Sequence, residues 1–184
     1  MAQYYKCPKC DAHAKVIKPG KGVLSCCGKD MEPVLNFASP DDILDFAITR
    51  EQEAHDFYAE WADKLDNKWI REVFRDFARE EEKHRDVLSK AKQGGTLKPS
   101  DKKITDLKIS DYLIDITPTP DMDYQKALVV AMKREYASYK FYSDLSETVS
   151  DPGLKETLTA LAQEEAKHKL RLETMYEKEV LLWD

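Results

Sequence analysis

Two copies of a carboxylate–imidazole pair stand out in this sequence. Glu81 and His84 are three residues apart, and Glu165 and His168 repeat the same spacing. On an α-helix, residues three apart face the same side, so both side chains of a pair can bind one metal ion. A single pair would carry little weight, because helix surfaces are rich in Glu and His. The second copy indicates a metal site with two halves.

The two pairs belong to an internal repeat of 84 residues (168 − 84 = 84). The same shift places Glu51 on Glu135, so two further carboxylates accompany the pairs in register. It also aligns neighbours of these carboxylates, namely Arg50 with Arg134, Phe57 with Phe141, and Tyr58 with Tyr142. The repeat therefore predicts a paired metal site rather than two unrelated surface pairs.

Amphipathic helices are needed to hold these residues. The first is predicted to begin at Ser39, an N-cap followed by Pro40 and two acids, and Glu51 lies in the middle of its apolar stripe. A buried carboxylate is costly there unless it has a cation or a hydrogen-bond partner. The break at 66–67 allows only a short loop, so the next helix is expected to run back antiparallel.

The second helix is predicted from about Lys68 to Lys92, with Glu81 and His84 on its inner face. Glu80 and Glu82 lie on either side of Glu81 around the helix, so we expect them to be more exposed. This position relative to the apolar stripe is the reason for choosing Glu81 among three adjacent acids.

Residues 94–122 are irregular, with a short helical turn expected near 110–114. A connection of this length can cross from one end of a helical bundle to the other. A third helix is predicted to start at Asp121 or Asp123 and to carry Glu135 inward. Asp151 is the expected cap of a fourth helix, which carries the second Glu–His pair.

Composition indicates which binding partners and which cellular compartment to expect. The chain has 184 residues, enough for one domain and a small appendage, and its net charge of −6 argues against nucleic acid or an anionic membrane as partner. No stretch approaches the length of a membrane span, and the N-terminus lacks an apolar run, so we expect a cytoplasmic protein. All four cysteines fall in the first 27 residues. In a reducing compartment such a cluster favours metal thiolates over disulfides.

Residues 1–36 are predicted to form a unit of their own, with short strands at 14–17 and 23–25. So few apolar residues cannot support a fold, so we expect a metal ion bound by the cysteine thiolates to stabilise it. Tetrahedral sulfur suits either zinc or iron. Adjacent Cys26 and Cys27 would pair with each other only under strain, although disulfides from each to Cys7 or Cys10 remain an alternative.

This N-terminal segment resembles desulforedoxin over nearly its whole length. The matching features are Tyr5-Lys6-Cys7-x-x-Cys10, Val16, Gly20-x-Gly22-x-Leu24 and Cys26-Cys27-Gly28-x-x-Met31. The adjacent cysteine pair distinguishes the pattern from rubredoxin and from common zinc ribbons. The resemblance implies one iron held by Cys7, Cys10, Cys26 and Cys27 that carries single electrons, with zinc as a possible substitute.

Residues 39–184 resemble rubrerythrin and related ferritin-like proteins. The matches are Glu51-x-x-Ala54-x-x-x-Tyr58, Ala78-x-x-Glu81-x-x-His84, Glu135 with Tyr142, and Ala162-x-x-Glu165-x-x-His168. The resemblance implies a mainly α fold, a ferritin-like four-helix bundle with one long crossover. It implies a di-iron centre with the ligands Glu51, Glu81, His84, Glu135, Glu165 and His168. Four carboxylates offset the charge of two divalent ions, and two of them can bridge the ions.

Three further residues bear on this site. Tyr58 and Tyr142 lie two turns after Glu51 and Glu135, and we expect their phenols to hydrogen-bond carboxylates of neighbouring helices, with plain core packing as the alternative. His55 is one turn from Glu51 on the same face, but the symmetric ligand set is complete without it.

Two departures from rubrerythrin are visible. Rubrerythrins carry a rubredoxin module at the C-terminus, whereas here the cysteine module comes first. They also have a further Glu three residues after the third-helix carboxylate, where this chain has Ser138. That Glu takes part in redox-linked ligand movement at one iron, so Ser138 predicts a more symmetric site.

The resemblance implies an NAD(P)H-linked peroxidase of oxidative-stress defence. A reductase or a rubredoxin-like carrier would pass electrons through the cysteine-bound iron to the di-iron centre, which would reduce hydrogen peroxide to water. Because electron transfer favours short distances, we expect a homodimer in which the N-terminal module of one subunit lies near the bundle of the other. Two alternatives remain: a ferroxidase or iron-binding protein that uses dioxygen, and a redox sensor with a structural zinc.

Overall fold

The computed structural model describes residues 3–7, 9, 13–16, 22–33, 37 and 39–178. The chain divides into two compact units, Met1–Ile43 and Leu44–Asp184. Of the residues singled out above, Cys10 and Gly20 lie outside the described ranges.

The N-terminal unit contains two small antiparallel sheets. In the first, β1 (Gln3–Lys6) lies between β2 (His13–Val16) and β5 (Glu32–Pro33). The second is a hairpin of β3 (Ser25–Cys26) and β4 (Lys29–Asp30). Its two turn residues, Cys27 and Gly28, have φ of 55° and 71°, the left-handed conformation that tight hairpin turns require. The predicted strands overlap β2 and β3, whereas β1, β4 and β5 were not predicted.

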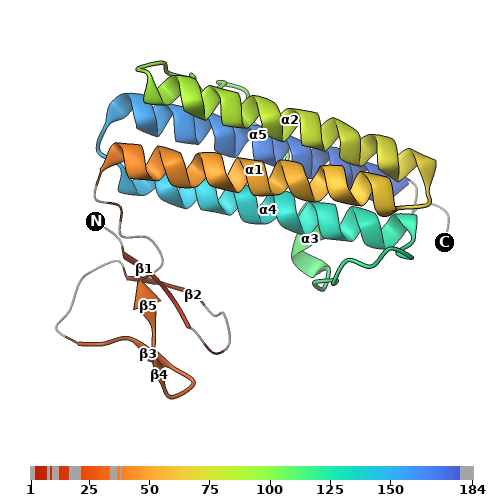
Figure 1. Cartoon of the computed structure of the whole chain (residues 1–184), viewed down its shortest axis with the longest axis horizontal. Helices are drawn as coiled ribbons and strands as arrows, with labels where there is room; N and C mark the ends of the chain where they lie inside the picture. The colour runs from red at the N-terminus through yellow and green to blue at the C-terminus, as the bar shows by residue number, and fades with distance from the viewer. Residues whose placement is uncertain are drawn as a thin grey trace. The chain divides into compact units, whose positions relative to one another are not determined.

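Four helices of 25 residues each make up the second unit and lie side by side (Figure 1). They are α1 (Pro40–Lys64), α2 (Lys68–Lys92), α4 (Tyr124–Thr148) and α5 (Pro152–Tyr176). The links at 65–67 and 149–151 are short, so α1 with α2 and α4 with α5 form antiparallel hairpins. The predicted mainly α, four-helix fold is confirmed.

Side chains at the helix starts explain where the helices begin. The hydroxyl of Ser39 accepts the backbone N–H of Asp42 at 3.2 Å, and the Asp42 carboxylate accepts the N–H of Ser39 at 2.8 Å. This reciprocal arrangement satisfies two N–H groups at the start of α1. Asn67, Asp123 and Asp151 cap α2, α4 and α5 in the usual way, each through a side-chain oxygen.

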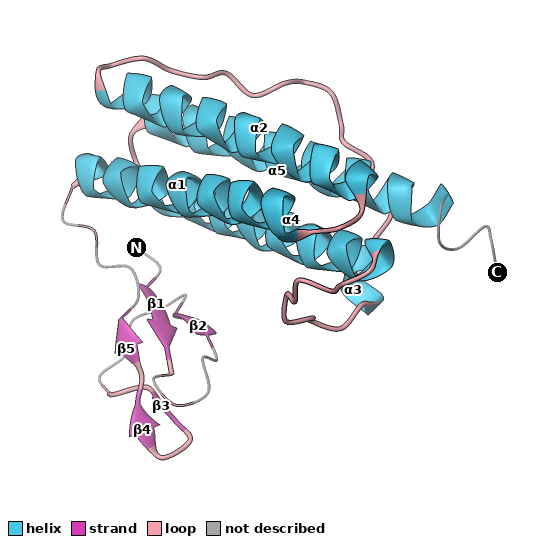
Figure 2. Cartoon of the chain, turned by 45° about the vertical axis from the view of Figure 1, so that its right-hand side comes forward, coloured by secondary structure: helices cyan, strands magenta, loops and turns pink. Residues whose placement is uncertain are grey.

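The crossover between α2 and α4 follows α5 along the bundle (Figure 2). It contains one short helix, α3 (Ile109–Tyr112). Its polar contacts progress in step with α5: Leu97 with Thr157, Ser100 with Gln163, Asp106 with Lys169, and Ser110 with Glu173. The crossover thus runs parallel to α5 and delivers the chain to the opposite end of the bundle, where α4 starts.

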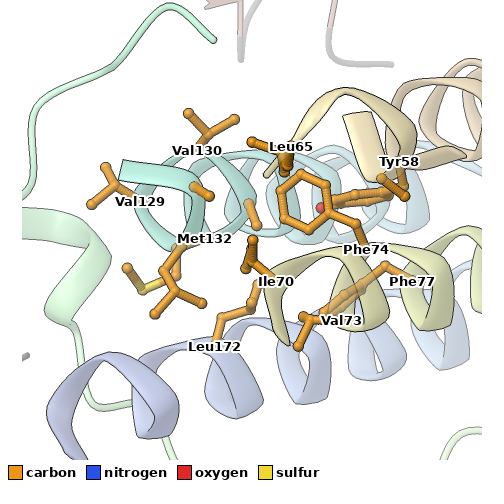
Figure 3. Packing of buried hydrophobic residues seen from close by; sticks show 14 of the residues in the cluster. Tyr58, Leu65, Ile70, Val73, Phe74, Phe77, Val129, Val130, Met132 and Leu172 are labelled. Atoms are coloured by element: carbon orange, nitrogen blue, oxygen red, sulfur yellow. The ribbon is translucent and has the colours of Figure 1, made fainter. Parts of the chain in front are cut away.

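A hydrophobic cluster fills the end of the bundle near the α1–α2 turn (Figure 3). The fully buried residues there include Tyr58 of α1, Leu65 in the link after it, Ile70, Phe74 and Phe77 of α2, Met132 of α4 and Leu172 of α5. The predicted metal residues lie next to this cluster, one or two turns further along each helix. Within the described ranges, no helix is both long enough and apolar enough to cross a membrane.

Candidate metal centre

All six predicted metal residues of the bundle are buried. Their exposed fractions lie between 1% and 7%, and they come from four different helices. Glu51 lies on α1 and Glu135 on α4, each in the middle of a helix whose apolar neighbours face the core. The two Glu–His pairs lie on α2 and α5. The helical spacing and the burial together bring these residues to one centre.

The six residues form two groups that could each hold a metal ion. One contains Glu51, Glu81, His84 and Glu165, and the other contains Glu81, Glu135, Glu165 and His168. In each group one potential ligand atom per residue lies within 4.8 Å of all the others. Glu81 and Glu165 belong to both groups, which places their carboxylates between the two positions.

Both imidazoles turn their Nδ1 atoms toward the carboxylates. The Nδ1 of His84 lies 3.0 Å from Glu165 and 3.2 Å from Glu81. The Nδ1 of His168 lies 2.9 Å from Glu135 and 3.6 Å from Glu165. The two rings stack with their centroids 5.2 Å apart and their planes 14° from parallel. The two histidines therefore make similar Nδ1 contacts from corresponding positions on α2 and α5.

Two tyrosines hold the outer carboxylates. The hydroxyl of Tyr58 on α1 donates to Oε1 of Glu135 on α4, and the hydroxyl of Tyr142 on α4 donates to Oε1 of Glu51 on α1. The 84-residue shift relates Tyr58 to Tyr142 and Glu135 to Glu51. The two contacts between α1 and α4 are therefore counterparts of each other in the repeat. Each leaves Oε2 of the same carboxylate free to face the centre.

Burial and neighbouring charges shift the pKa values of this centre in opposite directions. Burial raises the pKa of Glu135 to about 7, although the hydrogen bond to His168 opposes the rise. Burial also raises the pKa of Glu81, helped by the nearby charges of Glu165 and Glu135. The pKa of Glu165 falls well below its usual value, because the two imidazoles outweigh its burial.

The histidines and tyrosines respond to the same carboxylates. Burial alone would lower the pKa of His84 and His168, but the surrounding carboxylates raise both pKa values well above the ordinary value. Burial and carboxylate charge together raise the pKa of Tyr58 and Tyr142, so both phenols stay protonated and act as donors. The centre therefore retains protons that a cation would displace.

The donor set fits a pair of metal ions. Oε2 of Glu51 and both carboxylate oxygens of Glu165 are buried and accept no hydrogen bond of ordinary geometry within the described ranges. Buried carboxylate oxygens of this kind are costly without a cation. Carboxylates and imidazoles suit divalent iron, manganese or zinc.

Other residues from the sequence analysis lie elsewhere. The Nδ1 of His55 donates to the backbone oxygen of Ala78 at 2.9 Å, and His55 belongs to neither metal group. The guanidinium of Arg134 stacks on Phe57 with 3.8 Å to the ring centroid, whereas Arg50 pairs with Glu53 on the surface. His55 therefore lies outside the two groups of potential metal ligands, while Glu51, Glu81, His84, Glu135, Glu165 and His168 remain the predicted ligands.

Glu80 contacts the centre, which sequence reasoning missed. It is more exposed than Glu81, as expected, but its carboxylate lies 3.0 Å from Nε2 of His168. Helical periodicity gives no signal for this contact, because the residue lies at the edge of the inner face and reaches across to another helix.

The N-terminal unit brings three cysteines together. Sγ atoms of Cys7, Cys26 and Cys27 all lie within 4.8 Å of one another, and none of the three is in a disulfide. Cys7 is fully buried and Cys27 is exposed at the turn of the β3–β4 hairpin. Three sulfur atoms at this spacing can bind one metal ion, with Cys10 as the predicted fourth ligand.

Comparisons with known proteins match the two parts of the chain to two different family models. Residues 42–176 match the rubrerythrin family model, and residues 1–34 match the model of the desulfoferrodoxin N-terminal domain. Both resemblances inferred from the sequence are thereby confirmed. A search of curated proteins found no match to this chain.

Two solved structures are similar to the chain. An uncharacterized conserved protein from Magnetospirillum magnetotacticum MS-1 is 28% identical, with a TM-score of 0.56 over 78% of this chain and 95% of that one. A hypothetical protein from Pyrococcus furiosus is 27% identical, with a TM-score of 0.54 over 80% of this chain and 93% of that one. Neither description names an activity.

Proposed function

Because the chain belongs to the rubrerythrin family, we propose that it is a peroxidase that reduces hydrogen peroxide to water at two iron ions held in its helical bundle. Membership places it among iron-binding oxidoreductases of the ferritin-like class. The oxidant, the path of the electrons and the roles of individual residues are our proposal.

The observation that carries the proposal is the sharing of Glu81 and Glu165 by two adjacent metal groups. Reduction of hydrogen peroxide to two waters consumes two electrons and two protons. The residues of the two groups would hold two iron ions, which would supply one electron each, the number that full reduction of the peroxide requires. The role of Glu81 and Glu165 is to hold the two positions next to each other.

The other residues of the centre orient and shield it. Tyr58 and Tyr142 occupy Oε1 of Glu135 and Glu51, so that Oε2 of each carboxylate is directed inward. Phe77 packs against the edge of the His168 ring, with 5.1 Å between centroids, and excludes water from that side. A dry, pre-oriented set of donors is what a reactive metal pair needs.

The cysteine module is the proposed electron entry point. Cys7, Cys26 and Cys27, with Cys10, would hold one iron, whose single-electron chemistry matches stepwise delivery from a reductase. Iron and zinc counted per chain in the purified protein test this assignment. Three iron ions per chain would support the electron relay. Two iron ions and one zinc ion per chain would indicate that the cysteine module is structural and would favour a redox sensor or scaffold.

The peroxidase proposal is tested without oxygen. The fully reduced protein receives one equivalent of hydrogen peroxide per bundle, and absorbance follows oxidation of both iron sites. We expect rapid oxidation of the bundle site and, with a reductase present, continued peroxide consumption. A bundle site that stays reduced would exclude the proposal, and faster oxidation by dioxygen than by peroxide would favour a ferroxidase.

Two neighbouring glutamates provide the variant and its control. Glu81→Gln removes a carboxylate shared by both metal groups, and we expect peroxide consumption to fall at least about a hundredfold. Glu82→Gln alters the next residue, whose side chain is 53% exposed and pairs with Arg85 on the same helix. That variant should keep the wild-type rate.

A further inference from the structure

The two repeats make similar contacts at the six metal residues but different contacts at the residues next to them. The shift that aligns the two Glu–His pairs also aligns Glu80 with Glu164 (164 − 80 = 84). Both precede the paired glutamate by one residue, and their side chains are similarly exposed, 33% for Glu80 and 39% for Glu164. From sequence and exposure alone, the two residues would be equivalent.

Their contacts differ. Oε2 of Glu80 lies 3.0 Å from Nε2 of His168, the ring nitrogen that faces away from the carboxylates of the centre. That oxygen is buried and accepts no hydrogen bond of ordinary geometry within the described ranges. The distance of 3.0 Å is within hydrogen-bonding range, so the Glu80 carboxylate is placed to accept the N–H of this ring nitrogen.

Glu164 turns away from the centre. Its carboxylate pairs with Lys167 on its own helix at 2.6 Å. The polar contacts of His84 found in the described part of the chain all involve Nδ1. One imidazole thus has a carboxylate on its outer nitrogen, and the other has none.

The neighbours of the two glutamates account for the difference. Arg171 on α5 pairs with Asp76 on α2 at 3.0 Å, and its guanidinium lies 3.9 Å from Glu80. This cation between the two helices favours a Glu80 carboxylate turned toward α5. The repeat replaces Arg171 by Val87 and Asp76 by Ala160. Because no cation takes the corresponding place, Glu164 finds its partner in Lys167.

We propose that Glu80 is a positioning residue for His168 only, so that the two metal positions of the bundle are unequal. This inference rests on the metal centre of the proposed function. A carboxylate on Nε2 keeps the N–H on that nitrogen, directs Nδ1 at the metal and increases its basicity. His168 is held from both ring nitrogens, whereas the contacts of His84 within the described residues all involve Nδ1. The position at His168 therefore binds metal first and more tightly.

The experiment uses zinc ions as the probe, because zinc has no redox chemistry and suits NMR. The full-length protein, free of metal and labelled with ¹⁵N, is titrated with Zn²⁺ while long-range ¹H–¹⁵N spectra follow each histidine side chain. The chain has four histidines, so His84 and His168 are followed separately from zinc uptake by the cysteines. The variants are Glu80→Ala and, as the matched control, Glu164→Ala. A further variant, Glu80→Gln, keeps an acceptor without the charge.

We expect Nδ1 of His168 to respond at lower zinc concentration than Nδ1 of His84 in the wild type. In Glu80→Ala, zinc affinity at His168 should fall about tenfold or more, with His84 affected less. Glu80→Gln should recover part of the loss, and Glu164→Ala should match the wild type. Circular dichroism checks that each variant keeps its helices.

Three results would overturn the inference. The two histidines could respond together in the wild type, Glu80→Ala could leave both unchanged, or the two alanine variants could weaken zinc binding alike. If neither histidine responds to zinc, the proposed metal centre itself would be contradicted. The titration does not involve peroxide, so the peroxidase proposal can fail in its own test while unequal zinc binding stands.

Discussion

At the scale of single residues, the hydroxyls of Tyr58 and Tyr142 make the clearest contacts to the predicted metal ligands. Each is the donor to one buried carboxylate oxygen on the opposite hairpin. Tyr58→Phe or Tyr142→Phe leaves that oxygen without a donor in the metal-free protein. The expected cost is about 1–3 kcal/mol in the free energy of unfolding, measured by urea denaturation.

Tyr139→Phe is the control for these two variants. Tyr139 is half-buried on the same helix as Tyr142, and its hydroxyl makes no hydrogen bond to the described residues. Its loss should change the unfolding free energy by less than about 0.5 kcal/mol. Equal costs for Tyr58→Phe and Tyr139→Phe would show that the phenols only fill space.

The protons retained by the centre predict how metal affinity depends on pH. Glu135, with a pKa of about 7 in the metal-free protein, is protonated below that pH, and a metal ion must then displace the proton. The raised pKa values of His84 and His168 have the same effect and extend it upward in pH. Zinc affinity at the two histidines should therefore rise as pH increases through about 7.

Zinc titrations at several pH values, followed by the histidine signals, measure this dependence. Glu135→Gln removes one titrating group and should make the dependence on pH less steep. Affinities that stay constant between about pH 6 and pH 8 would contradict the prediction.

The residues of the centre divide into those that a pattern can reveal and those that it cannot. The repeat and the apolar stripe identify Glu51, Glu81 and their counterparts, because burial of a carboxylate at helical spacing demands a partner. The grouping of Glu165 with His84 depends on how two helices pack. Glu80 depends in addition on Arg171, a cation on another helix, so no local pattern reports it.

At the scale of elements, a buried ion cluster fixes the crossover to α5. Lys169 pairs with Asp106 of the crossover and lies 3.3 Å from Glu173, while Glu173 accepts the backbone N–H of Ser110. The Lys169 side chain is 5% exposed and that of Glu173 is fully buried, whereas Asp106 is 47% exposed. The cluster therefore contains one buried pair, Lys169 with Glu173, and one pair with an exposed partner, Lys169 with Asp106.

The two pairs should differ in their contribution to stability. Lys169→Met leaves the Glu173 carboxylate buried without a cation, and we expect a loss of roughly 3 kcal/mol in unfolding free energy. Asp106→Asn removes only the exposed partner and should cost less than about 1 kcal/mol. Thermal and urea unfolding followed by circular dichroism compare the variants. Similar losses for both would mean that Lys169 acts mainly through the surface pair.

The helices and the crossing from one end of the bundle to the other were predictable, but the helix along which the crossover runs was not. Apolar periodicity and the caps Ser39 and Asp151 locate the helices, since these signals are local. The route of the crossover depends on contacts between residues about sixty positions apart, such as Ser100 with Gln163. The strands β1 and β5 pair across the whole N-terminal unit, so their short sequences give no local signal.

At the scale of the whole molecule, the expected homodimer allows a complementation test of the electron relay. One variant, Glu81→Gln, keeps the cysteine module but loses the bundle site. The other, Cys7→Ser, keeps the bundle site but loses a module ligand. If the module of one subunit serves the bundle of the other, mixed dimers contain one working pair out of two.

Statistical mixing makes half of all dimers mixed, so about a quarter of the wild-type peroxide consumption should return. The two variants are mixed after mild dissociation, and size-exclusion chromatography verifies that dimers re-form. Each variant alone serves as the blank. No recovery in a re-formed dimer would place the relay within one subunit.

The sharing of Glu81 and Glu165 has a consequence for assembly. Each metal group takes residues from both helical hairpins, so neither hairpin holds a complete group by itself. Bound metal would consequently add a direct link between two repeats that otherwise meet through apolar side chains and a few polar contacts, such as those of Tyr58 and Tyr142. A chain cut within the crossover should yield fragments whose association tightens when metal is present, and a cell short of iron would hold a looser form of this protein.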